Sequence, residues 1–425
     1  MVLAMARVYV ESYGCTMNHG EARTFIEMIR RRGHSIVSRP EHADFIVVFT
    51  CTVVDYTEKK ILKRLKELEK LRGGLIITGC MAAAQRKMLM EIFPEAILFA
   101  PTYYPYIVEY IDRGVIITRK YMDKVRIPRP TDVIVTVPIA EGCNQDCAYC
   151  ITKIARGRVV RSYPIDDLVE DVKELVKSGV REIRLSSQDT AVYGIDKGYT
   201  LVDLLREIVR IPGKFKVRVG MMNPQNAIGF IEDLVDVFKD QKIYKFLHVP
   251  VQSGSERILR LMNRSHGVFE YVHIVNLFRS SFDYSTISTD IIVGYPGETL
   301  RDFLDSYRLI ERTRPNIVNI TRFSPRPFTE AAKLKNNVPG WIAKERSSIL
   351  AKLAKNISLE ENRKLVGKRV KAMVNEIGKD KTLIARDDAY RPIVVKNVDR
   401  KVLLGSYQKI EITEAKETYL IGEII

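Results

Sequence analysis

The sequence predicts an α/β protein in three parts: an N-terminal open parallel α/β domain, a central partial (β/α)6 barrel and a small C-terminal antiparallel β-barrel. Apolar, β-branched runs alternate with amphipathic helical segments over the first three quarters of the 425 residues. From about residue 365, short strands separated by turn residues replace the helical pattern. We expect the domain boundaries at residues 1–125, 126–360 and 361–425.

The N-terminal domain is expected to contain three parallel strands with helices between them. The apolar runs predict strands over residues 7–11, 43–49 and 75–78, and the amphipathic segments predict helices over residues 20–32, 57–71 and 84–92. Residues 119–132 are charged, carry two prolines and have no clear period, so this segment is expected to be a linker.

The central domain repeats a strand–helix unit about six times. Strands are expected over residues 133–138, 182–186, 214–219, 245–250, 288–293 and 316–323, and helices over residues such as 165–177, 201–211 and 300–313. Six units fall short of the eight that close a full barrel, so the barrel is expected to be partial. A basic helix over residues 341–364 leads to five short strands, which predict a closed β-barrel.

The charge balance favours a polyanionic partner. The chain has 68 Lys and Arg against 52 Asp and Glu, a net charge of +16, while 46% hydrophobic residues exclude general disorder. From Arg363 onward there are 14 basic and nine acidic residues, a net charge of +5. Nucleic acid is the partner that such a surplus most often serves, and the alternative is the charged surface of a thermophile's protein.

The chain is expected in the reducing cytoplasm. The apolar run from Met1 to Met5 is short and is followed closely by Arg7, unlike a signal peptide, and no stretch reaches the roughly 18 apolar residues of a membrane span. A chain of this length does not need disulfides to fold, so its six Cys indicate metal or redox chemistry.

One Cys cluster follows the first strand of the central domain. Cys143, Cys147 and Cys150 have C-x3-C-x2-C spacing. Three thiolates at this spacing can hold three irons of a [4Fe–4S] cluster and leave the fourth iron open to S-adenosylmethionine, which the cluster would cleave to a 5′-deoxyadenosyl radical. A structural zinc site is the alternative, but zinc takes four ligands and no His lies close by.

The other three Cys are far apart in the sequence. Cys15, Cys51 and Cys80 each lie just past the carboxyl end of a predicted parallel strand. Because these ends meet at the ligand crevice of an open α/β sheet, we expect the three thiols to converge and hold a second open cluster. Three unrelated buried thiols, or a zinc site completed by His19, are the alternatives.

Further polar residues follow barrel strands. Gln188 follows the second strand, and Gln252 and Ser253 follow the fourth, where side chains face the site mouth; we assign these three to S-adenosylmethionine or substrate. Tyr149, inside the Cys cluster, is assigned to the cofactor as well. Loop and cap hydrogen bonds are the alternative, and Ser255 fits a helix N-cap.

Basic residues form two candidate contact sets. Arg156, Arg158 and Arg161 follow the C-x3-C-x2-C motif and could meet phosphate or the cofactor carboxylate. On the C-terminal module, cations interleaved with Tyr390 suit RNA. We assign RNA contacts to Arg386, Arg391, Arg400 and Lys401.

These residues carry a family resemblance that covers essentially the whole chain. YGCTMN, TCTV, TGCMA, EGCNQDCAYC, RGRVVRS, LSSQDTAVYG, HVPVQSGS, STDIIVGYPGET and FSPRP resemble the MiaB/RimO/MtaB family of radical S-adenosylmethionine methylthiotransferases. The C-terminal strands resemble its TRAM domain, and the central domain its radical-SAM barrel. Phe328 departs from the family, which usually has Gly in this run.

The resemblance implies an enzyme with two [4Fe–4S] clusters. Cys143, Cys147 and Cys150 become ligands of the radical cluster, and Cys15, Cys51 and Cys80 those of the auxiliary cluster. Family members use two S-adenosylmethionine molecules: one methylates a sulfur at the auxiliary cluster and the other supplies the radical. An electron donor such as a ferredoxin or flavodoxin is implied, and no catalytic residue is assigned beyond the cluster ligands.

The resemblance leaves several substrates to choose among. Family branches modify adenosine 37 of tRNA carrying threonylcarbamoyl, the same base carrying isopentenyl, or an aspartate of a ribosomal protein. The basic C-terminal module favours tRNA and its anticodon loop. A Lys-, Arg- and Ile-rich chain with seven Gln looks like a thermophilic archaeal protein, and the archaeal members resemble the threonylcarbamoyl branch. The alternative from a different functional class is a non-catalytic iron–sulfur RNA-binding protein.

Overall fold

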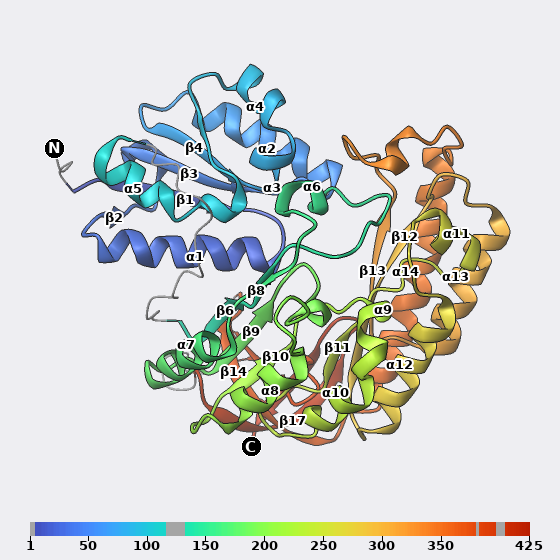
Figure 1. Ribbon diagram of the computed structural model, residues 1–425. Helices are drawn as coiled ribbons and strands as arrows, with labels where there is room; N and C mark the ends of the chain where they lie inside the picture. The colour runs from blue at the N-terminus through green and yellow to red at the C-terminus, as the bar shows by residue number, and fades with distance from the viewer. Residues whose placement is uncertain (1–4, 116–131, 380–381, 397–403) are drawn as a thin grey trace. The chain divides into compact units, whose positions relative to one another are not determined.

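The computed structural model describes residues 5–115, 132–379, 382–396 and 404–425 (Figure 1). Contacts divide the chain into two compact units. The first unit contains Met1–Pro130, Thr136–Tyr163 and Ser324–Ala332, and the second contains Thr131–Val135, Pro164–Phe323 and Lys333–Ile425. Nearly all of the predicted linker lies outside the described residues, and no helix among those described is long and apolar enough to cross a membrane.

The first unit is built on the predicted parallel sheet. Its five strands have the order β2-β1-β3-β4-β5. Their bounds are β1 (Arg7–Ser12), β2 (Ser35–Ile36), β3 (Phe45–Thr50), β4 (Gly74–Gly79) and β5 (Ile97–Leu98). The three expected strands β1, β3 and β4 are confirmed, while the edge strands β2 and β5 have two residues each and are too short to show an alternating pattern.

Helices cover both faces of this sheet (Figure 1). They are α1 (Thr16–Arg31), α2 (Asp55–Leu68), α3 (Cys80–Ala84), α4 (Arg86–Ile92) and α5 (Tyr106–Arg113). Successive residues of a strand point to opposite faces. On β3, Val47 and Phe49 therefore pack in the core of α1 and α5, while Ile46 and Val48 pack in the core of α2 and α4.

A second group of short elements completes the first unit. These are the antiparallel pair β7 (Ala140–Glu141) and β8 (Arg161–Ser162), and helix α6 (Thr152–Arg156). The segment Ser324–Ala332 belongs here too, although it follows the last barrel strand in sequence. Strand β6 (Ile134–Pro138) begins in the second unit and ends in the first.

The second unit contains the predicted partial barrel. Its six strands form two three-stranded sheets, β10-β9-β6 and β11-β12-β13, and an isolated parallel bridge joins Val217 of β10 to Ile243, just before β11. The bounds are β9 (Glu182–Ser186), β10 (Lys216–Arg218), β11 (Phe246–His248), β12 (Thr286–Val293) and β13 (Ile317–Arg322). All six expected strands are confirmed.

Helices connect the barrel strands. They are α7 (Ile165–Lys177), α8 (Leu201–Arg210), α9 (Pro224–Ala227), α10 (Ile231–Phe238), α11 (Glu256–Leu261), α12 (Val268–Ser280), α13 (Leu300–Thr313) and α14 (Gly340–Arg363). Ser255 caps α11 as expected, because its hydroxyl accepts a hydrogen bond from the backbone of Ile258. Short 3-10 turns are η1 (Pro40–His42), η2 (Pro101–Tyr103), η3 (Thr190–Val192), η4 (Ile228–Phe230) and η5 (Glu330–Lys333).

The C-terminal strands close into a five-stranded barrel of order β14-β15-β16-β18-β17. They are β14 (Arg369–Ile377), β15 (Leu383–Asp387), β16 (Pro392–Val395), β17 (Tyr407–Ala415) and β18 (Leu420–Ile424). The small antiparallel barrel is confirmed, with one parallel pair, β16 and β18. A closed barrel with an odd number of strands cannot make every neighbouring pair antiparallel, so one parallel pair is unavoidable.

This small barrel docks on the partial barrel within the second unit. The ring of Tyr390 lies 4.8 Å from that of Tyr244 and 5.1 Å from that of Phe246, measured between centroids. Its hydroxyl donates to a carboxylate oxygen of Glu182 at 3.0 Å. Tyr390 is thus an anchor between the two barrels.

Candidate functional site

The sheet topology brings Cys15, Cys51 and Cys80 to one edge. Cys15 follows β1 and immediately precedes α1, Cys51 is the residue after β3, and Cys80 is the first residue of α3 after β4. The three strands are neighbours, and the last residues of β3 and β4, Thr50 and Gly79, are register partners. The predicted convergence at the carboxyl ends therefore follows directly from the strand order.

Two glycines allow these loops to pack closely. Gly14 has φ of +100°, and a Cβ there would lie 2.8 Å from the Cys51 sulfur. Gly79 has φ of +93°, and a Cβ there would lie 2.3 Å from the carbonyl oxygen of Thr50. Both positions demand a left-handed backbone and leave no space for a side chain, so glycine is required at each.

The three thiols influence one another electrostatically. Burial raises the pKa of Cys51, and the nearby Cys15 thiol raises it further. Burial raises the pKa of Cys80 to about 11; Cys15 and Cys51 add to the rise, while Arg156 opposes it. Cys15 is exposed, Cys51 and Cys80 are buried, and all six cysteines of the chain are free thiols.

The second Cys set sits in one loop between β7 and α6. The backbone N–H of Cys150 donates to the carbonyl of Cys147 at 3.1 Å, which folds the loop into a turn. Cys147 is buried, while Cys143, Tyr149 and Cys150 are partly exposed. Burial raises the pKa of Cys150, and Cys147 raises it further. Gly142, at φ +79°, allows the start of this loop to pack closely against Val159, since a Cβ there would lie 2.0 Å from the carbonyl oxygen of Val159.

The two Cys sets pack together within the first unit. Cys80 and Ala84 of α3 share a buried apolar cluster with Ile151 and Ala155. Ile151 is the residue directly after Cys150, and Ala155 lies on α6. Both Cys loops are therefore attached to the same small core, one from each side of the α3–α6 contact.

A buried ion pair joins the same two regions. The guanidinium of Arg156, on α6, donates to both carboxylate oxygens of Glu21, on α1, at 2.6 and 2.8 Å. Glu141 lies 3.5 Å away. Burial disfavours the charged guanidinium, but Glu21 and Cys80 outweigh it, and the pKa of Arg156 is raised. Arg156 was expected to meet phosphate or the cofactor; the structure commits its guanidinium to carboxylates of the chain.

The segment Ser324–Ala332 touches the loops of both Cys sets. Arg326 donates to the hydroxyl of Thr52 at 2.9 Å and pairs with Glu58, beside the Cys51 loop. The backbone N–H of Ala331 donates to the carbonyl of Ala148, between Cys147 and Cys150, at 2.9 Å. Sequence reasoning assigned Arg326 no role, because its partners lie more than 260 residues away.

Phe328 lies in this same segment with an unusual backbone. Its φ is +64°, in the left-handed region, and its side chain is 71% exposed. Glycine adopts this conformation without strain, whereas a bulky residue does so at a cost. The loop thus keeps a shape that suits Gly while carrying Phe.

The donor set suits iron–sulfur clusters. Within the described ranges, no three Cys, His, Asp or Glu side chains converge as they would around one metal ion. Each thiolate of a cubane binds a different iron, so sulfurs that surround a cluster need not meet at a point. His19, the alternative zinc ligand, has its Nδ1 2.7 Å from the hydroxyl of Ser12. Six free thiols in two sets of three fit two clusters with open irons.

The other proposed cofactor residues belong to the second unit. Gln188 is partly exposed and lies two residues beyond β9. Gln252 has φ of +73°, and its backbone N–H donates to the carbonyl of Asp290 at 2.8 Å. Ser253 is buried, and its hydroxyl accepts from the backbone of Ser255 at 3.2 Å. A glutamine held in a strained left-handed conformation at a strand end marks a candidate ligand position.

The proposed RNA contacts fall into two groups. Arg386 pairs with Glu376 at 3.1 Å and Arg391 pairs with Asp387 at 2.6 Å, and their side chains are only 18% and 14% exposed. Arg400 and Lys401 lie outside the described residues. RNA contact by the first two would therefore compete with carboxylates that already hold them.

Comparison with known proteins assigns the whole chain. Residues 7–100 match the uncharacterized protein family UPF0004, residues 137–310 the radical SAM superfamily, and residues 363–425 the TRAM domain. A probable threonylcarbamoyladenosine tRNA methylthiotransferase of Pyrococcus horikoshii is 42% identical over 99% of this chain and 100% of its own length. The chain belongs to the tRNA methylthiotransferase family.

Other relatives of this methylthiotransferase family span similar lengths. A protein of the same name from Archaeoglobus fulgidus is 40% identical over 98% of both chains. A tRNA-2-methylthio-N(6)-dimethylallyladenosine synthase of Dictyoglomus thermophilum is 32% identical over 99% of both. Among solved structures, the radical S-adenosylmethionine methyltransferase TsrM of Kitasatospora setae has a TM-score of 0.56 at 11% identity, covering 77% of this chain and 74% of its own. That likeness supports the fold alone.

Proposed function

We propose that the chain is a radical S-adenosylmethionine enzyme that converts N6-threonylcarbamoyladenosine at position 37 of tRNA to its 2-methylthio derivative. The observation that carries the proposal is the attachment of two three-thiol sets to one buried core. Cys80 and Ile151 share that core, and Arg156 ties α6 to α1. A reaction that needs both a radical source and a sulfur carrier requires two such sets close together.

Each thiol set would have its own task. When bound, a cluster on Cys143, Cys147 and Cys150 would supply the electron that cleaves S-adenosylmethionine, and one on Cys15, Cys51 and Cys80 would carry the sulfur. The chain itself orients the loops: glycines set their approach, and the buried Arg156–Glu21 pair holds α6 against α1. Tyr149, Gln188, Gln252 and Ser253 are proposed to position the cofactor.

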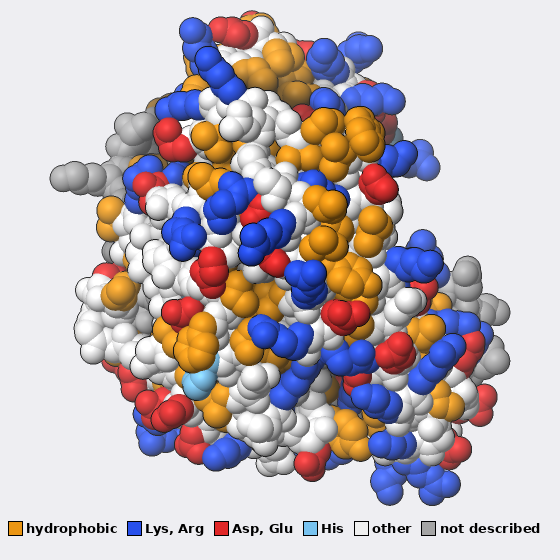
Figure 2. Space-filling view, turned by 90° about the vertical axis from the view of Figure 1, so that its right-hand side faces the viewer, with side chains coloured by type: hydrophobic (Ala, Val, Ile, Leu, Met, Phe, Trp, Pro, Cys, Tyr) orange, Lys and Arg blue, Asp and Glu red, His pale blue; other side chains and the backbone are white. Residues whose placement is uncertain are grey.

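A tRNA substrate is supported by charge and by family membership. The net charge of +16 favours a polyanion, and Figure 2 displays many Lys and Arg side chains among fewer Asp and Glu on one face. The target base must leave its stack before C2 can react, which is easiest in an unpaired anticodon loop. Arg400 and Lys401 remain proposed RNA contacts, and neutralising both should flatten the salt dependence of tRNA binding.

The threonylcarbamoyl branch is favoured over the isopentenyl branch. The relatives at 42% and 40% identity carry the threonylcarbamoyladenosine name, whereas the relative at 32% carries the dimethylallyladenosine name. A threonylcarbamoyl group adds a carboxylate, which a basic chain can bind through Lys or Arg. A ferredoxin or flavodoxin is the proposed electron donor, and the reaction is proposed to take place in the cytoplasm.

The test uses three anticodon stem-loops: unmodified, isopentenylated and threonylcarbamoylated. Reconstituted, reduced protein is incubated with each, and the nucleosides are analysed by mass spectrometry. We expect the 2-methylthio product from the threonylcarbamoylated loop alone. Product from the isopentenylated loop alone would move the chain to the other branch, and a failure to form 5′-deoxyadenosine at all would leave only an iron–sulfur RNA-binding protein.

A further inference from the structure

A cavity in the second unit lies away from the proposed cofactor residues. It has a volume of about 490 Å³ and is lined by the start of β11, β12 and β13, by α14 and by the C-terminal barrel. Phe246 and Thr286 are the first residues of β11 and β12. His248, the last residue of β11, lines the cavity as well, whereas Gln252 and Ser253 lie further along the chain and are not lining residues.

Three side-chain atoms in the cavity wall lack hydrogen-bond partners among the described residues: the Thr286 hydroxyl, the Nε of Arg218 and the Nε of Arg386, whose guanidinium still pairs with Glu376. The Thr286 hydroxyl is buried without a hydrogen-bond partner among the described residues, and Thr286 is only 3% exposed. The Nε of Arg218 is also buried without a partner, and no carboxylate in the described ranges pairs with this guanidinium. Leaving such groups unsatisfied is costly, which indicates that a ligand supplies the missing contacts.

Among the described residues that line the cavity, Arg218 is an arginine without a carboxylate partner. Arg391 pairs with Asp387 at 2.6 Å, Arg386 with Glu376 at 3.1 Å, and Lys355 with Glu417 at 2.9 Å. Arg218 instead faces aromatic rings, its guanidinium lying 4.9 Å from the Phe246 centroid and 5.7 Å from that of Tyr390. The charge balance therefore calls for one anionic group beside Arg218.

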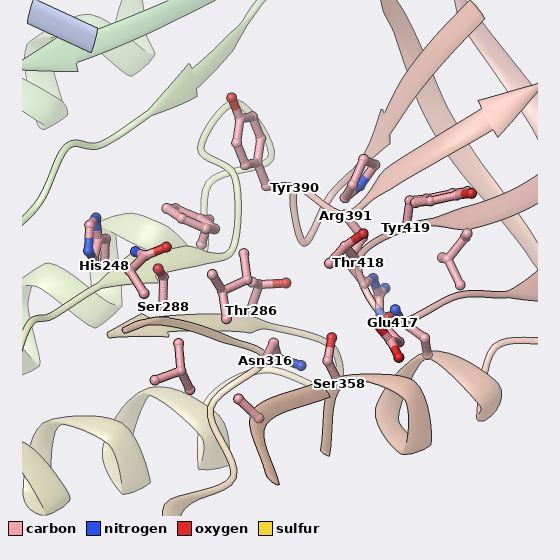
Figure 3. Close-up of a pocket in the computed structure, with 18 of the residues that line it drawn as sticks. His248, Thr286, Ser288, Asn316, Ser358, Tyr390, Arg391, Glu417, Thr418 and Tyr419 are labelled. Atoms are coloured by element: carbon pink, nitrogen blue, oxygen red, sulfur yellow. The ribbon is translucent and has the colours of Figure 1, made fainter. Parts of the chain in front are cut away.

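The rest of the wall suits a ring with polar edges. Figure 3 shows Thr286, Ser288 and Asn316 across the cavity from Arg391, Thr418 and Tyr419. Asn316 accepts from the backbone of Ile287 at 2.9 Å through its amide oxygen, so its amide nitrogen is left to donate. Aromatic side chains that line the cavity offer stacking surfaces.

We propose that this cavity binds a nucleoside monophosphate, with its phosphate at Arg218, its ring among the aromatic side chains and a polar atom at the Thr286 hydroxyl. The volume lies within the range of small-ligand pockets. A nucleotide combines one anionic group, an aromatic ring and hydrogen-bonding edges, and these are the three features the wall complements. The nucleotide is either free in solution or part of an RNA chain.

The test is calorimetric titration of the full chain with AMP, adenosine and inorganic phosphate. S-adenosylmethionine is kept in excess so that the cofactor position does not contribute. We expect AMP to bind at least tenfold more tightly than adenosine or phosphate, because only AMP offers both ring and anion. Equal affinity for phosphate and AMP would reduce the site to simple anion attraction and overturn the proposal.

Two variants and a matched control locate the binding. Arg218→Gln and Thr286→Val should each weaken AMP binding at least tenfold, while Arg260→Gln, which removes the same charge from an exposed position on α11, should change it less than twofold. The melting temperature of Arg218→Gln should fall only slightly, since the variant loses ring contacts with Phe246 and Tyr390 but breaks no ion pair among the described residues. Equal AMP affinity in the Arg218 and Arg260 variants would contradict the assignment. If Arg218→Gln fails to fold, the isosteric Thr286→Val decides alone.

A competition identifies the source of the nucleotide. Displacement of AMP by an anticodon stem-loop, with both weakened by Thr286→Val, would assign the cavity to a nucleotide of RNA. No displacement would assign it to a free nucleotide. Either result is independent of the methylthiolation assay, because binding is measured without turnover.

Discussion

The two Cys sets are positioned by different levels of structure. Cys143, Cys147 and Cys150 lie within eight consecutive residues, so one loop brings them together. Cys15, Cys51 and Cys80 lie at one edge of the sheet only because β1, β3 and β4 are neighbours in a parallel sheet. One set depends on local loop geometry and the other on the fold of the whole domain. A substitution that disturbs only one of these should therefore affect the cluster of one Cys set and spare the other.

The largest difference between the two Cys sets should appear when the thiols of one set are removed. Replacing Cys143, Cys147 and Cys150 with Ala should abolish both 5′-deoxyadenosine and methylthio product, because the radical source is lost. Replacing Cys15, Cys51 and Cys80 should abolish the product and keep 5′-deoxyadenosine formation. Iron and sulfide analysis should show each variant with about half of the wild-type content. Full content in either variant would refute the ligand assignment.

Breaking the ion pair between the two regions should be the next largest effect. Arg156→Met leaves Glu21 buried and unpaired, which costs about 3–5 kcal/mol in the free energy of unfolding. Because Arg156 holds α6 against α1, product formation should fall more than 5′-deoxyadenosine formation does. Denaturant unfolding measures the loss. The double variant Arg156→Met/Glu21→Met should recover most of it, and no recovery would show that the pair itself is not responsible.

Glycine substitutions should perturb one set at a time. Gly79→Ala and Gly142→Ala each place a Cβ under 2.5 Å from a backbone oxygen and should cost about 2–4 kcal/mol. Gly79→Ala should lower cluster content at Cys15, Cys51 and Cys80, and Gly142→Ala at the other set. Gly33→Ala is the control, since it has φ of +82° and open space, and should cost about 1 kcal/mol with full iron content. Identical iron losses in the first two variants would argue against separate positioning.

Mild acid should weaken the second unit around His266. Burial lowers the pKa of His266 to about 3, with Arg264 adding to the effect. A histidine with a lowered folded pKa stabilises fully above the unfolded pKa near 6.5, and this stability is lost as pH falls. At pH 5 the loss should reach about 2 kcal/mol. Hydrogen exchange at pH 7 and pH 5 should show faster opening around α11 and α12, and His266→Gln should remove most of the difference.

The smallest effect should be a gain in stability at Phe328. Both Phe328→Gly and Phe328→Ala remove the exposed ring, but only Gly relieves the strain of the left-handed backbone. The free energy of unfolding of Phe328→Gly should therefore exceed that of Phe328→Ala by about 1 kcal/mol. Thermal unfolding of the two variants measures the difference. Equal stability would mean that the backbone changes conformation when the ring is removed.

The sequence was sufficient for features that repeat along the chain. The strand–helix period predicted β1, β3 and β4, and their carboxyl ends located the three distant Cys. Pairing between distant segments was not predictable: Arg156 and Glu21 are 135 residues apart, and no local pattern links them. The segment Ser324–Ala332 likewise belongs to the first unit although it follows a barrel strand of the second.

Arginine roles were the least accessible to sequence reasoning. A run of cations looks the same whether it faces phosphate or a carboxylate of its own chain. Arg386 meets Glu376 because β14 and β15 pair, and Arg391 meets Asp387 across the turn between β15 and β16. Charge composition thus predicted a polyanionic partner for the chain without identifying which cations are available to it.

The most direct test of the account is whether two clusters lie side by side in one unit. Electron paramagnetic resonance of the reduced full chain should be compared with the spectra of the two triple Cys variants, each of which retains one set. We expect the full-chain spectrum to be broadened by magnetic interaction between neighbouring clusters and to differ from the sum of the variant spectra. A full-chain spectrum equal to that sum would contradict the central claim.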